Sequence, residues 1–263
     1  MEPPKRINVL GVGISEINYD TALEQIRAAI VERRKGYVAV TGVHGVSESQ
    51  SDPALRNILN ESFLTTPDGV PMVWLGKLAG SSAISRVYGP DLMLRVLEDG
   101  VERGWRHFFF GGGDGVAQEL RDALTARFPG LQVVGTYTPP FRPLNDAEEA
   151  DLARQVAEAR PDCFWVGLGT PKQERFMPKY LPRLETTLMF GVGAAFDFHT
   201  GRVRQAPSAL QKAGLEWAFR LAVEPKRLWR RYLGNNPPFI GRAFLQLTGL
   251  RRYPDVPHQL RPW

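Results

Sequence analysis

The segment CFWVGLGTPKQE, residues 163–174, contains the pattern on which the fold prediction rests. It begins with a continuous apolar run, as expected of a strand that is buried on both faces of a sheet. Gly167 and Gly169 follow this run, and residues 173–180 then have the spacing of an amphipathic helix. A strand, a glycine turn and a helix in this order are typical of a parallel sheet.

The same order recurs along most of the chain. Apolar runs predict further strands at 7–11, 37–41, 63–66, 107–110, 132–136 and 187–192. Helical patterns cover 21–33, 90–103, 116–128 and 146–159. We therefore predict an α/β fold with a Rossmann-like, mostly parallel sheet and helices on both of its faces.

The pattern changes after about Pro207, where basic, aromatic-rich helical stretches begin. Pro225 and the run NNPP at 235–238 are expected to interrupt these helices. We predict an α/β catalytic domain over 1–207, a small basic helical C-terminal appendage over 208–250 and a mobile tail over 251–263.

The basic residues of the chain are unevenly distributed. From Arg220 onward, nine Lys and Arg residues stand against Glu224 and Asp255, a net charge of +7, whereas the preceding 219 residues have a net charge of −2. Apolar and aromatic residues alternate with the arginines, which suits an anionic membrane surface or a lipid diphosphate. A helical pair packed on the core, with a solvated basic face, would have the same pattern. Because no nucleic-acid-binding motif accompanies the charge, we expect no nucleic acid partner.

Two further features bear on location. Cys163, the single cysteine, lies in an apolar run and cannot form a disulfide within the chain. The N-terminal residues lack the apolar stretch of a signal peptide, and the longest apolar run, 187–196, is much shorter than the roughly 20 residues that span a bilayer. The single cysteine and the lack of a signal peptide predict a cytoplasmic protein. The basic C-terminal region and the lack of a spanning segment predict that it associates peripherally with the inner face of the plasma membrane.

Gly-x-Gly pairs follow several of the predicted strands, at 11/13, 111/113, 167/169 and 191/193. Glycines at the carboxyl ends of parallel strands let backbone amides approach a diphosphate, whose charge the next helix N-terminus favours. Tight turning from strand to helix is the alternative. A dinucleotide fingerprint would need a small residue at the sixth position, where these loops have Glu16, Val116, Lys172 and Phe196. An NAD-dependent oxidoreductase therefore remains an alternative without its main sequence signal.

A carboxylate stands in a proline-flanked loop, TTPDGVP at 65–71, directly after a predicted strand. Held rigidly there, Asp68 can take a proton from an attacking hydroxyl; a turn in which it is a local hydrogen-bond acceptor is the alternative. Asp197 and His199 are metal-ligand types, but no third ligand and no Asp-x-Asp motif accompany them. We therefore expect neither a metal nor another cofactor.

Six segments together carry a resemblance to a known family. They are TPDGVP (66–71), RVYGPDLM (86–93), FFFGGGDG (108–115), GLGTPKQE (167–174), GVGAAFDFHTG (191–201) and GLEWAFRLAVEPKRLWRRY (214–232). In order and spacing, from about residue 7 to 240, the chain resembles the WecG/TagA/CpsF family of bacterial glycosyltransferases. These enzymes serve exopolysaccharide, teichoic acid and enterobacterial common antigen synthesis.

The resemblance implies an inverting, metal-independent enzyme that transfers a hexosyl or N-acetylhexosaminyl group from a UDP-sugar to a polyprenyl-diphosphate-linked saccharide. It implies that Asp68 is the base and that Thr41, Arg86 and Gln173 belong to the catalytic site. The candidate donor-binding residues are Gly111, Gly112, Gly113, Gly169, Thr170, Lys172, Gly191, Gly193 and Asp197. The candidate lipid-diphosphate-binding residues are Arg220, Arg227 and Arg230 or Arg231. A non-catalytic UDP-binding adaptor at the membrane surface remains a second alternative.

The chain departs from the family pattern at three places. His44 stands where an asparagine is common, Gln205 replaces the arginine of a usual Arg-Ala-Pro, and Ser208-Ala209 stands where a large residue is frequent. These departures weaken any transfer of sugar identity from better-known members, and they do not touch the proposed base.

Overall fold

The computed structural model describes residues 2–256, and its centre is a six-stranded sheet in which all strands are parallel. The strand order is β4-β3-β8-β7-β5-β6. The strands are β3 (Gly36–Thr41), β4 (Leu64–Pro67), β5 (Arg106–Gly111), β6 (Gln132–Tyr137), β7 (Cys163–Gly167) and β8 (Leu188–Gly191). The predicted α/β fold with a parallel sheet is confirmed.

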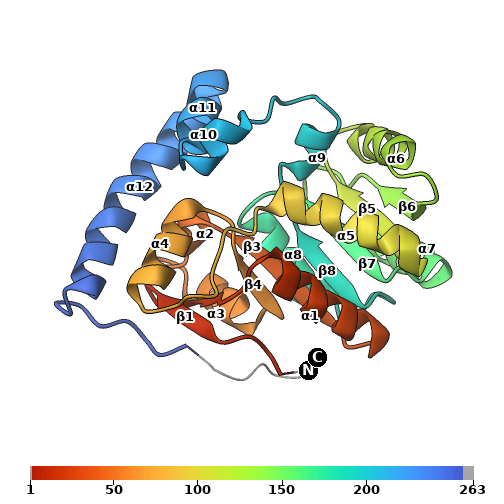
Figure 1. Cartoon of the computed structure of the whole chain (residues 1–263). Helices are drawn as coiled ribbons and strands as arrows, with labels where there is room; N and C mark the ends of the chain where they lie inside the picture. The colour runs from red at the N-terminus through yellow and green to blue at the C-terminus, as the bar shows by residue number, and fades with distance from the viewer. Residues whose placement is uncertain (1, 257–263) are drawn as a thin grey trace.

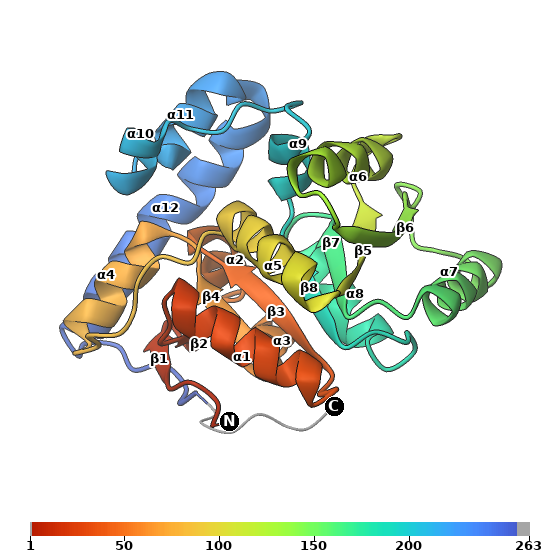
Figure 2. The ribbon, with the colours of Figure 1, turned by 45° about the vertical axis from the view of Figure 1, so that its right-hand side comes forward.

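Helices cover both faces of the sheet, as Figures 1 and 2 show. One layer consists of α1 (Tyr19–Val31), α5 (Gly89–Arg103), α6 (Val116–Arg127) and α9 (Ala195–His199). The other includes α2 (Val43–Glu48), α3 (Pro53–Glu61), α7 (Asp146–Ala159) and α8 (Lys172–Tyr180). Alternate strand residues point to opposite layers, so Phe109 packs in the core under α5 and α6 while Phe108 and Phe110 pack under α7 and α8.

The first predicted strand does not belong to this sheet. Residues 6–15 form an antiparallel hairpin of β1 (Arg6–Val9) and β2 (Val12–Ser15), and Leu10 and Gly11 make its two-residue turn with φ of 54° and 84°. Two positive φ values match the twist of a tight hairpin. A strand is thus present where one was predicted at 7–11, but its expected place in the parallel sheet and its strand-to-helix glycine loop are wrong.

The C-terminal region forms α10 (Ser208–Lys212), α11 (Glu216–Val223) and α12 (Pro225–Leu247). The predicted break at Pro225 is confirmed, since proline stands at the start of α12, where its missing N–H costs nothing. The predicted break at 235–238 is wrong, because α12 continues through Pro237 and Pro238. Beyond these prolines, Phe239 and Ala243 are buried against α2 and α4 (Val70–Leu78), so packing on the core outweighs the local proline penalty.

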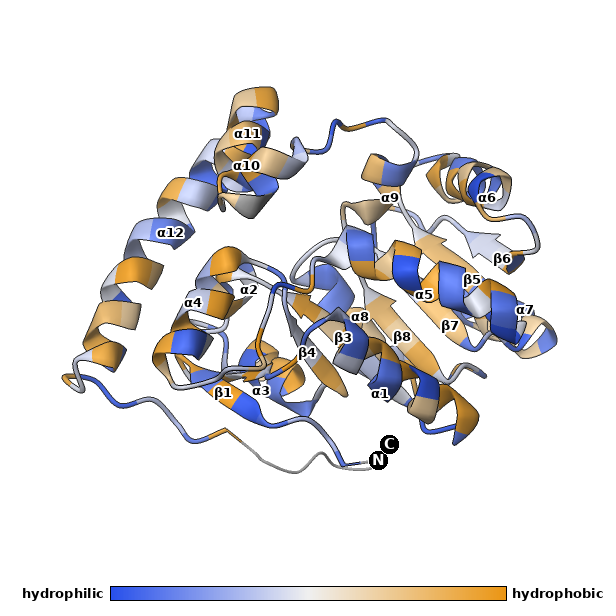
Figure 3. Ribbon diagram, in the orientation of Figure 1, coloured by the Kyte–Doolittle hydropathy of each residue, from blue (hydrophilic) through white to orange (hydrophobic). Residues whose placement is uncertain are grey.

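Hydrophilic and hydrophobic residues alternate along α12, as the colours in Figure 3 show. Its buried side faces the core, while Ile240, Phe244 and Leu247 are exposed. No helix within residues 2–256 combines the length and the apolar character needed to cross a bilayer.

The end of the described chain returns to the β1–β2 hairpin. The Asn8 side chain donates a hydrogen bond to the Pro254 carbonyl at 2.8 Å, and Val256 is buried near Gly13. The mobile tail predicted for 251–263 includes residues 257–263, which lie outside the described residues.

Candidate active site

A cleft of 1590 Å³ opens where the carboxyl ends of the strands face the C-terminal helices. The loops after β3, β4, β5, β7 and β8 all contribute to it, through Gly42, Asp68, Gly112, Gly169 and Gly193. Helices α11 and α12 form the opposite wall. Open α/β sheets bind ligands at this edge. The predicted glycine loops at 111/113, 167/169 and 191/193 and the basic helices meet here, whereas the pair at 11/13 does not line the cleft.

The glycines after β5 differ in what they do. Gly111 has a φ of 124°, and a Cβ there would lie 2.6 Å from the Gly167 carbonyl oxygen, so its role is the close approach of β5 to β7. Its neighbours Gly112 and Gly113 line the cleft, whereas Gly111 does not. The structure therefore brings two of these three predicted residues to the cleft.

The loop before α8 is held by the Gln173 amide. Its oxygen accepts a hydrogen bond from the Gly169 N–H at 3.1 Å, and its nitrogen donates to Glu174 at 3.1 Å. A Cβ on Gly191 would lie 3.1 Å from the Gln173 nitrogen, and one on Gly193 would lie 3.4 Å from its oxygen. Glycines at the end of β8 thus leave room for this amide.

Other predicted residues of this loop also line the cleft, namely Thr170 and Lys172. The Thr170 hydroxyl donates to Glu174 at 2.9 Å. Glu174 is 1% exposed, and burial raises the pKa of its carboxyl. Sequence reasoning gave Glu174 no role, because a glutamate at a helix start gives no sign that it will be buried.

Asp68 lies directly after β4, beside the first turn of α5. Its N–H donates to the Thr41 carbonyl at 3.1 Å, and its Oδ1 accepts from the Gly89 N–H at 2.9 Å. Burial raises the pKa of Asp68 to about 6; Glu216 also raises it, whereas Arg86, the Gly89 N–H and Arg220 oppose the shift. A carboxylate with a pKa near 6 is ionised at neutral pH and remains basic enough to accept a proton.

Thr41 supports Asp68 from below the cleft. The residue is 1% exposed, its hydroxyl donates to the Ala39 carbonyl at 3.3 Å, and its side chain does not line the cleft. Its contact with Asp68 is made by the backbone carbonyl. Of the four predicted catalytic residues, Asp68, Arg86 and Gln173 line the cleft and Thr41 does not.

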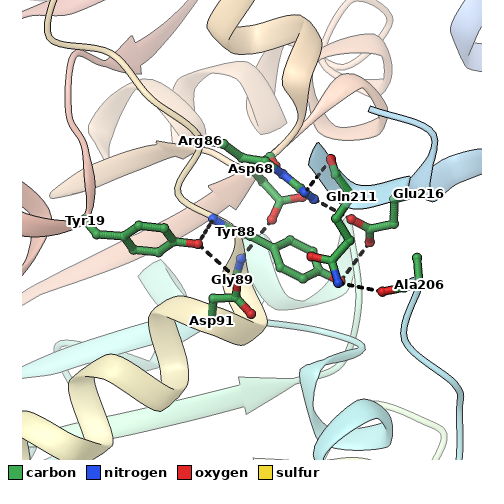
Figure 4. Close-up of polar contacts among 9 residues, drawn as sticks. All are labelled: Tyr19, Asp68, Arg86, Tyr88, Gly89, Asp91, Ala206, Gln211 and Glu216. Atoms are coloured by element: carbon green, nitrogen blue, oxygen red, sulfur yellow. Dashed lines mark hydrogen bonds and ion pairs between the residues drawn. The ribbon is translucent and has the colours of Figure 1, made fainter. Parts of the chain in front are cut away.

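Arg86 connects Asp68 to the C-terminal helices, as Figure 4 shows. Its Nε donates to the Asp68 carbonyl at 2.7 Å, and its guanidinium pairs with Glu216 at the start of α11. Tyr88 donates from its hydroxyl to the other Glu216 oxygen at 2.7 Å and lies under the guanidinium at 4.3 Å. Sequence reasoning missed Tyr88 and Glu216, although both lie in the quoted motifs, because nothing local indicates that they meet.

The predicted arginines of the C-terminal helices separate into two groups. Arg220, Arg227 and Arg231 line the cleft, whereas Arg230 does not and stacks instead on Trp229 at 5.3 Å. Within residues 2–256, the Nε atoms of Arg220 and Arg231 are buried without a hydrogen-bond partner. Buried donors of this kind are usually satisfied by a ligand or by water.

Two other polar residues face these arginines. Asp197 lines the cleft, and burial raises the pKa of its carboxyl, with Arg227 opposing the shift most strongly. His44, in the first turn of α2, also lines the cleft, and burial together with Arg231 lowers its pKa to about 4. His44 is therefore neutral at physiological pH.

An apolar surface continues the cleft between α4 and α12. Its exposed members are Trp74, Leu78, Ile240, Phe244 and Leu247.

In the described part of the chain, no group of three or more His, Cys, Asp or Glu side chains is arranged to hold a metal ion. The expected independence from metals stays a prediction.

Comparison with known proteins identifies the family. The model of the glycosyl transferase WecG/TagA/CpsF family matches residues 7–253. A protein named N-acetylglucosaminyldiphosphoundecaprenol N-acetyl-β-D-mannosaminyltransferase from Bacillus spizizenii is 30% identical over 230 residues, which cover 87% of this chain and 86% of that relative. A protein of the same name from Bacillus subtilis is 29% identical over 177 residues, 67% of each chain. The resemblance seen in the sequence is thus confirmed, and the chain is an enzyme of the WecG/TagA/CpsF family of glycosyl transferases.

Proposed function

We propose that this enzyme transfers a hexosyl or N-acetylhexosaminyl group from a UDP-sugar to a hydroxyl of a polyprenyl-diphosphate-linked saccharide, in cell-surface polysaccharide synthesis. The observation that carries the proposal is a single cleft that contains Asp68, the glycine loops and three arginines. These three residues, Arg220, Arg227 and Arg231, form the arginine wall. The names of the two Bacillus relatives, which specify a saccharide on undecaprenyl diphosphate, support the acceptor class. Family membership argues against the oxidoreductase and adaptor alternatives.

The donor diphosphate is assigned to the glycine loops. Gly112, Gly113 and Gly169 have no side chains and line the cleft close to the N-terminal ends of α6 and α8, where the helix dipole favours negative charge. Lys172 adds a positive charge at the start of α8. The sugar then extends from the diphosphate toward Asp68.

Transfer is proposed to be a single displacement. Asp68 accepts the proton of the acceptor hydroxyl, whose oxygen forms a bond to the anomeric carbon as the bond from that carbon to the UDP oxygen breaks. One displacement inverts the anomeric configuration. Arg86 and the N-terminal ends of α6 and α8 offset the charge on the departing UDP, a task that needs no metal ion.

The acceptor is assigned to the other end of the cleft. Arg220, Arg227 and Arg231 provide charge-assisted donors for a lipid diphosphate, and the buried Nε atoms of two of them are without protein partners within residues 2–256. The apolar surface of α4 and α12 is adjacent to them and suits a polyprenyl chain or the headgroup region of a membrane. We propose that the enzyme associates peripherally with the inner face of the plasma membrane, which this arrangement supports.

The test is acceptor-dependent release of UDP. The panel contains UDP-N-acetylmannosamine, UDP-glucose and UDP-glucuronate, each with and without a synthetic polyprenyl-diphosphate-sugar and with and without EDTA. We expect release from one donor, dependent on the acceptor and unaffected by EDTA, with an inverted anomeric centre in the product by NMR. Retained configuration would overturn the single displacement, and loss of release with EDTA would overturn metal independence.

A further inference from the structure

Glu216 is the first residue of α11, and its side chain crosses from the C-terminal helices to the loop that precedes α5 (Figure 4). Its side chain is only 13% exposed. No predicted role fell on this residue, yet it makes the closest polar contacts between α11 and the loop that carries Arg86.

Both carboxylate oxygens of Glu216 are used. One pairs with the Arg86 guanidinium, and the other accepts the Tyr88 hydroxyl at 2.7 Å. Arg86 in turn donates to the Asp68 carbonyl at 2.7 Å, and the Tyr88 N–H donates to the Tyr19 hydroxyl at 3.1 Å. Two short chains of contacts therefore begin at Glu216. One runs through Arg86 to the Asp68 carbonyl, and the other runs through Tyr88 to Tyr19 in α1.

The Asp68 side chain depends on the same loop. Its Oδ1 is held by the Gly89 N–H, one residue after Tyr88. A shift of the loop would therefore move the hydrogen-bond donor that orients the carboxylate. Misplacement of a catalytic group by about 1 Å can cost about a hundredfold in rate.

We propose that Glu216 is a positioning residue, which fastens α11 to the loop of Arg86 and Tyr88 and thereby sets the Asp68 carboxylate and the arginine wall in one arrangement. The inference rests on the proposed role of Asp68 as the base. It gives α11 a task beyond binding, because its docking and the geometry of the base are then linked through one side chain.

The charge of Glu216 also acts on Asp68. The groups that face Asp68 are Arg86, Tyr88 and the Gly89 N–H from the loop and α5, Tyr19 from α1, and Glu216 and Arg220 from α11. Among them, Glu216 raises the pKa of Asp68, while Arg86 and Arg220 lower it. Removing the negative charge of Glu216 should therefore lower the pKa of Asp68.

The experiment compares Glu216→Gln and Glu216→Ala with Asp99→Asn in the full chain. Asp99 is a matched control, because it makes a partly buried pair with Arg27 at 2.7 Å and 2.8 Å between α1 and α5, away from the cleft. Two quantities are measured: the pH profile of kcat/KM, and hydrogen exchange of peptides covering 86–92 and 214–223.

We expect Glu216→Gln to move the acid limb of kcat/KM to lower pH and to reduce kcat by about tenfold, with a smaller change in donor KM. Glu216→Ala should speed exchange in both peptides by about tenfold or more, and Asp99→Asn should change neither readout. An acid limb that coincides with that of the wild type, or unchanged exchange in Glu216→Ala, would overturn the inference. If the wild type transfers no sugar, the proposed function fails, while exchange still decides whether Glu216 fastens α11.

Discussion

At the scale of single residues, the raised pKa of Asp68 predicts the pH dependence of the enzyme. Burial raises this pKa to about 6, and a base must be ionised to act, so kcat/KM should fall below about pH 6 by tenfold per pH unit. The measurement is initial rate against pH at low donor concentration, with circular dichroism at each pH to confirm folding. A flat profile down to pH 5 would argue against Asp68 as the titrating base.

Replacing Asp68 by asparagine should separate activity from stability. Loss of a general base typically lowers the rate by ~10²–10⁴, and UDP binding should persist because the glycine loops are unchanged. The stability of Asp68→Asn at pH 7.5 should exceed that of the wild type by up to about 3 kcal/mol, since ionising a group whose pKa is raised from 3.8 to about 6 opposes folding. The gain should shrink as pH falls from 6 to 4, because Asp68 then becomes protonated in the folded protein.

Urea unfolding at pH 7.5 and pH 4.5 measures this difference. Asp99→Asn is the opposite control, because its partners Arg27 and Arg103 hold the pKa of Asp99 below its usual value and its loss should destabilise the fold. An Asp68→Asn variant that is less stable than the wild type at pH 7.5 would contradict the argument.

The sequence predicted single residues where one segment was enough. Asp68 and Gln173 stand in motifs directly after strands and do line the cleft. Thr41 also follows this pattern, but strand alternation points its side chain into the interior, and only its carbonyl meets Asp68. Glu216 could not be predicted, because its partner Arg86 is 130 residues away in sequence.

At the scale of elements, the approach of β5 to β7 depends on Gly111. In Gly111→Ala, the new Cβ would lie 2.6 Å from the Gly167 carbonyl oxygen at a φ of 124°, so we expect a loss of about 2–5 kcal/mol in stability. Gly113→Ala is the matched control, since no atom lies within 4 Å of its Cβ and its stability should change by less than about 0.5 kcal/mol. Urea unfolding measures the free energy of unfolding of both variants. If Gly111→Ala were as stable as Gly113→Ala, β5 and β7 could move apart at this point without a loss of stability.

The arginines of α12 offer a second matched pair. Arg231 lines the cleft with a buried Nε that lacks a partner within residues 2–256, whereas Arg230 stacks on Trp229 outside the cleft. Arg231→Gln should raise the KM for the lipid-diphosphate acceptor about tenfold or more, because a hydrogen bond to a charged group contributes about 1.5–3 kcal/mol. Arg230→Gln should change it less than about threefold, and the reverse order would place the diphosphate on the other face of the helix.

Elements were predicted well where their periodicity was undisturbed. All six parallel strands lie close to predicted runs, and five of the helices begin close to the predicted residues. The hairpin at 6–15 escaped prediction because Leu10 takes a positive φ that its residue type does not suggest. The continuity of α12 through Pro237 and Pro238 escaped prediction, because burial of Phe239 beyond the prolines is a tertiary effect.

At the scale of the whole molecule, the C-terminal helices share a core with the α/β part. Phe239 and Ala243 are buried with Val46 and Val73, and Gln246 accepts a hydrogen bond from the Leu10 N–H at 2.9 Å. Removing everything after Pro207 would therefore uncover apolar surface of the α/β part as well as remove the basic helices. Point substitutions on the exposed side of α12 are the cleaner way to examine membrane association.

The combined variant Ile240→Ser and Phe244→Ser should lower membrane binding without changing the core. Both side chains are more than 60% exposed, beside the arginine wall, and two apolar side chains that enter the headgroup region contribute a few kcal/mol. Co-sedimentation with vesicles that contain anionic phospholipid should fall by about tenfold or more. Val31→Ser is the control, because Val31 is 79% exposed at the end of α1 and lies outside the cleft. If both variants bind vesicles as well as the wild type, charge alone holds the enzyme at the membrane, and binding should then disappear at high salt.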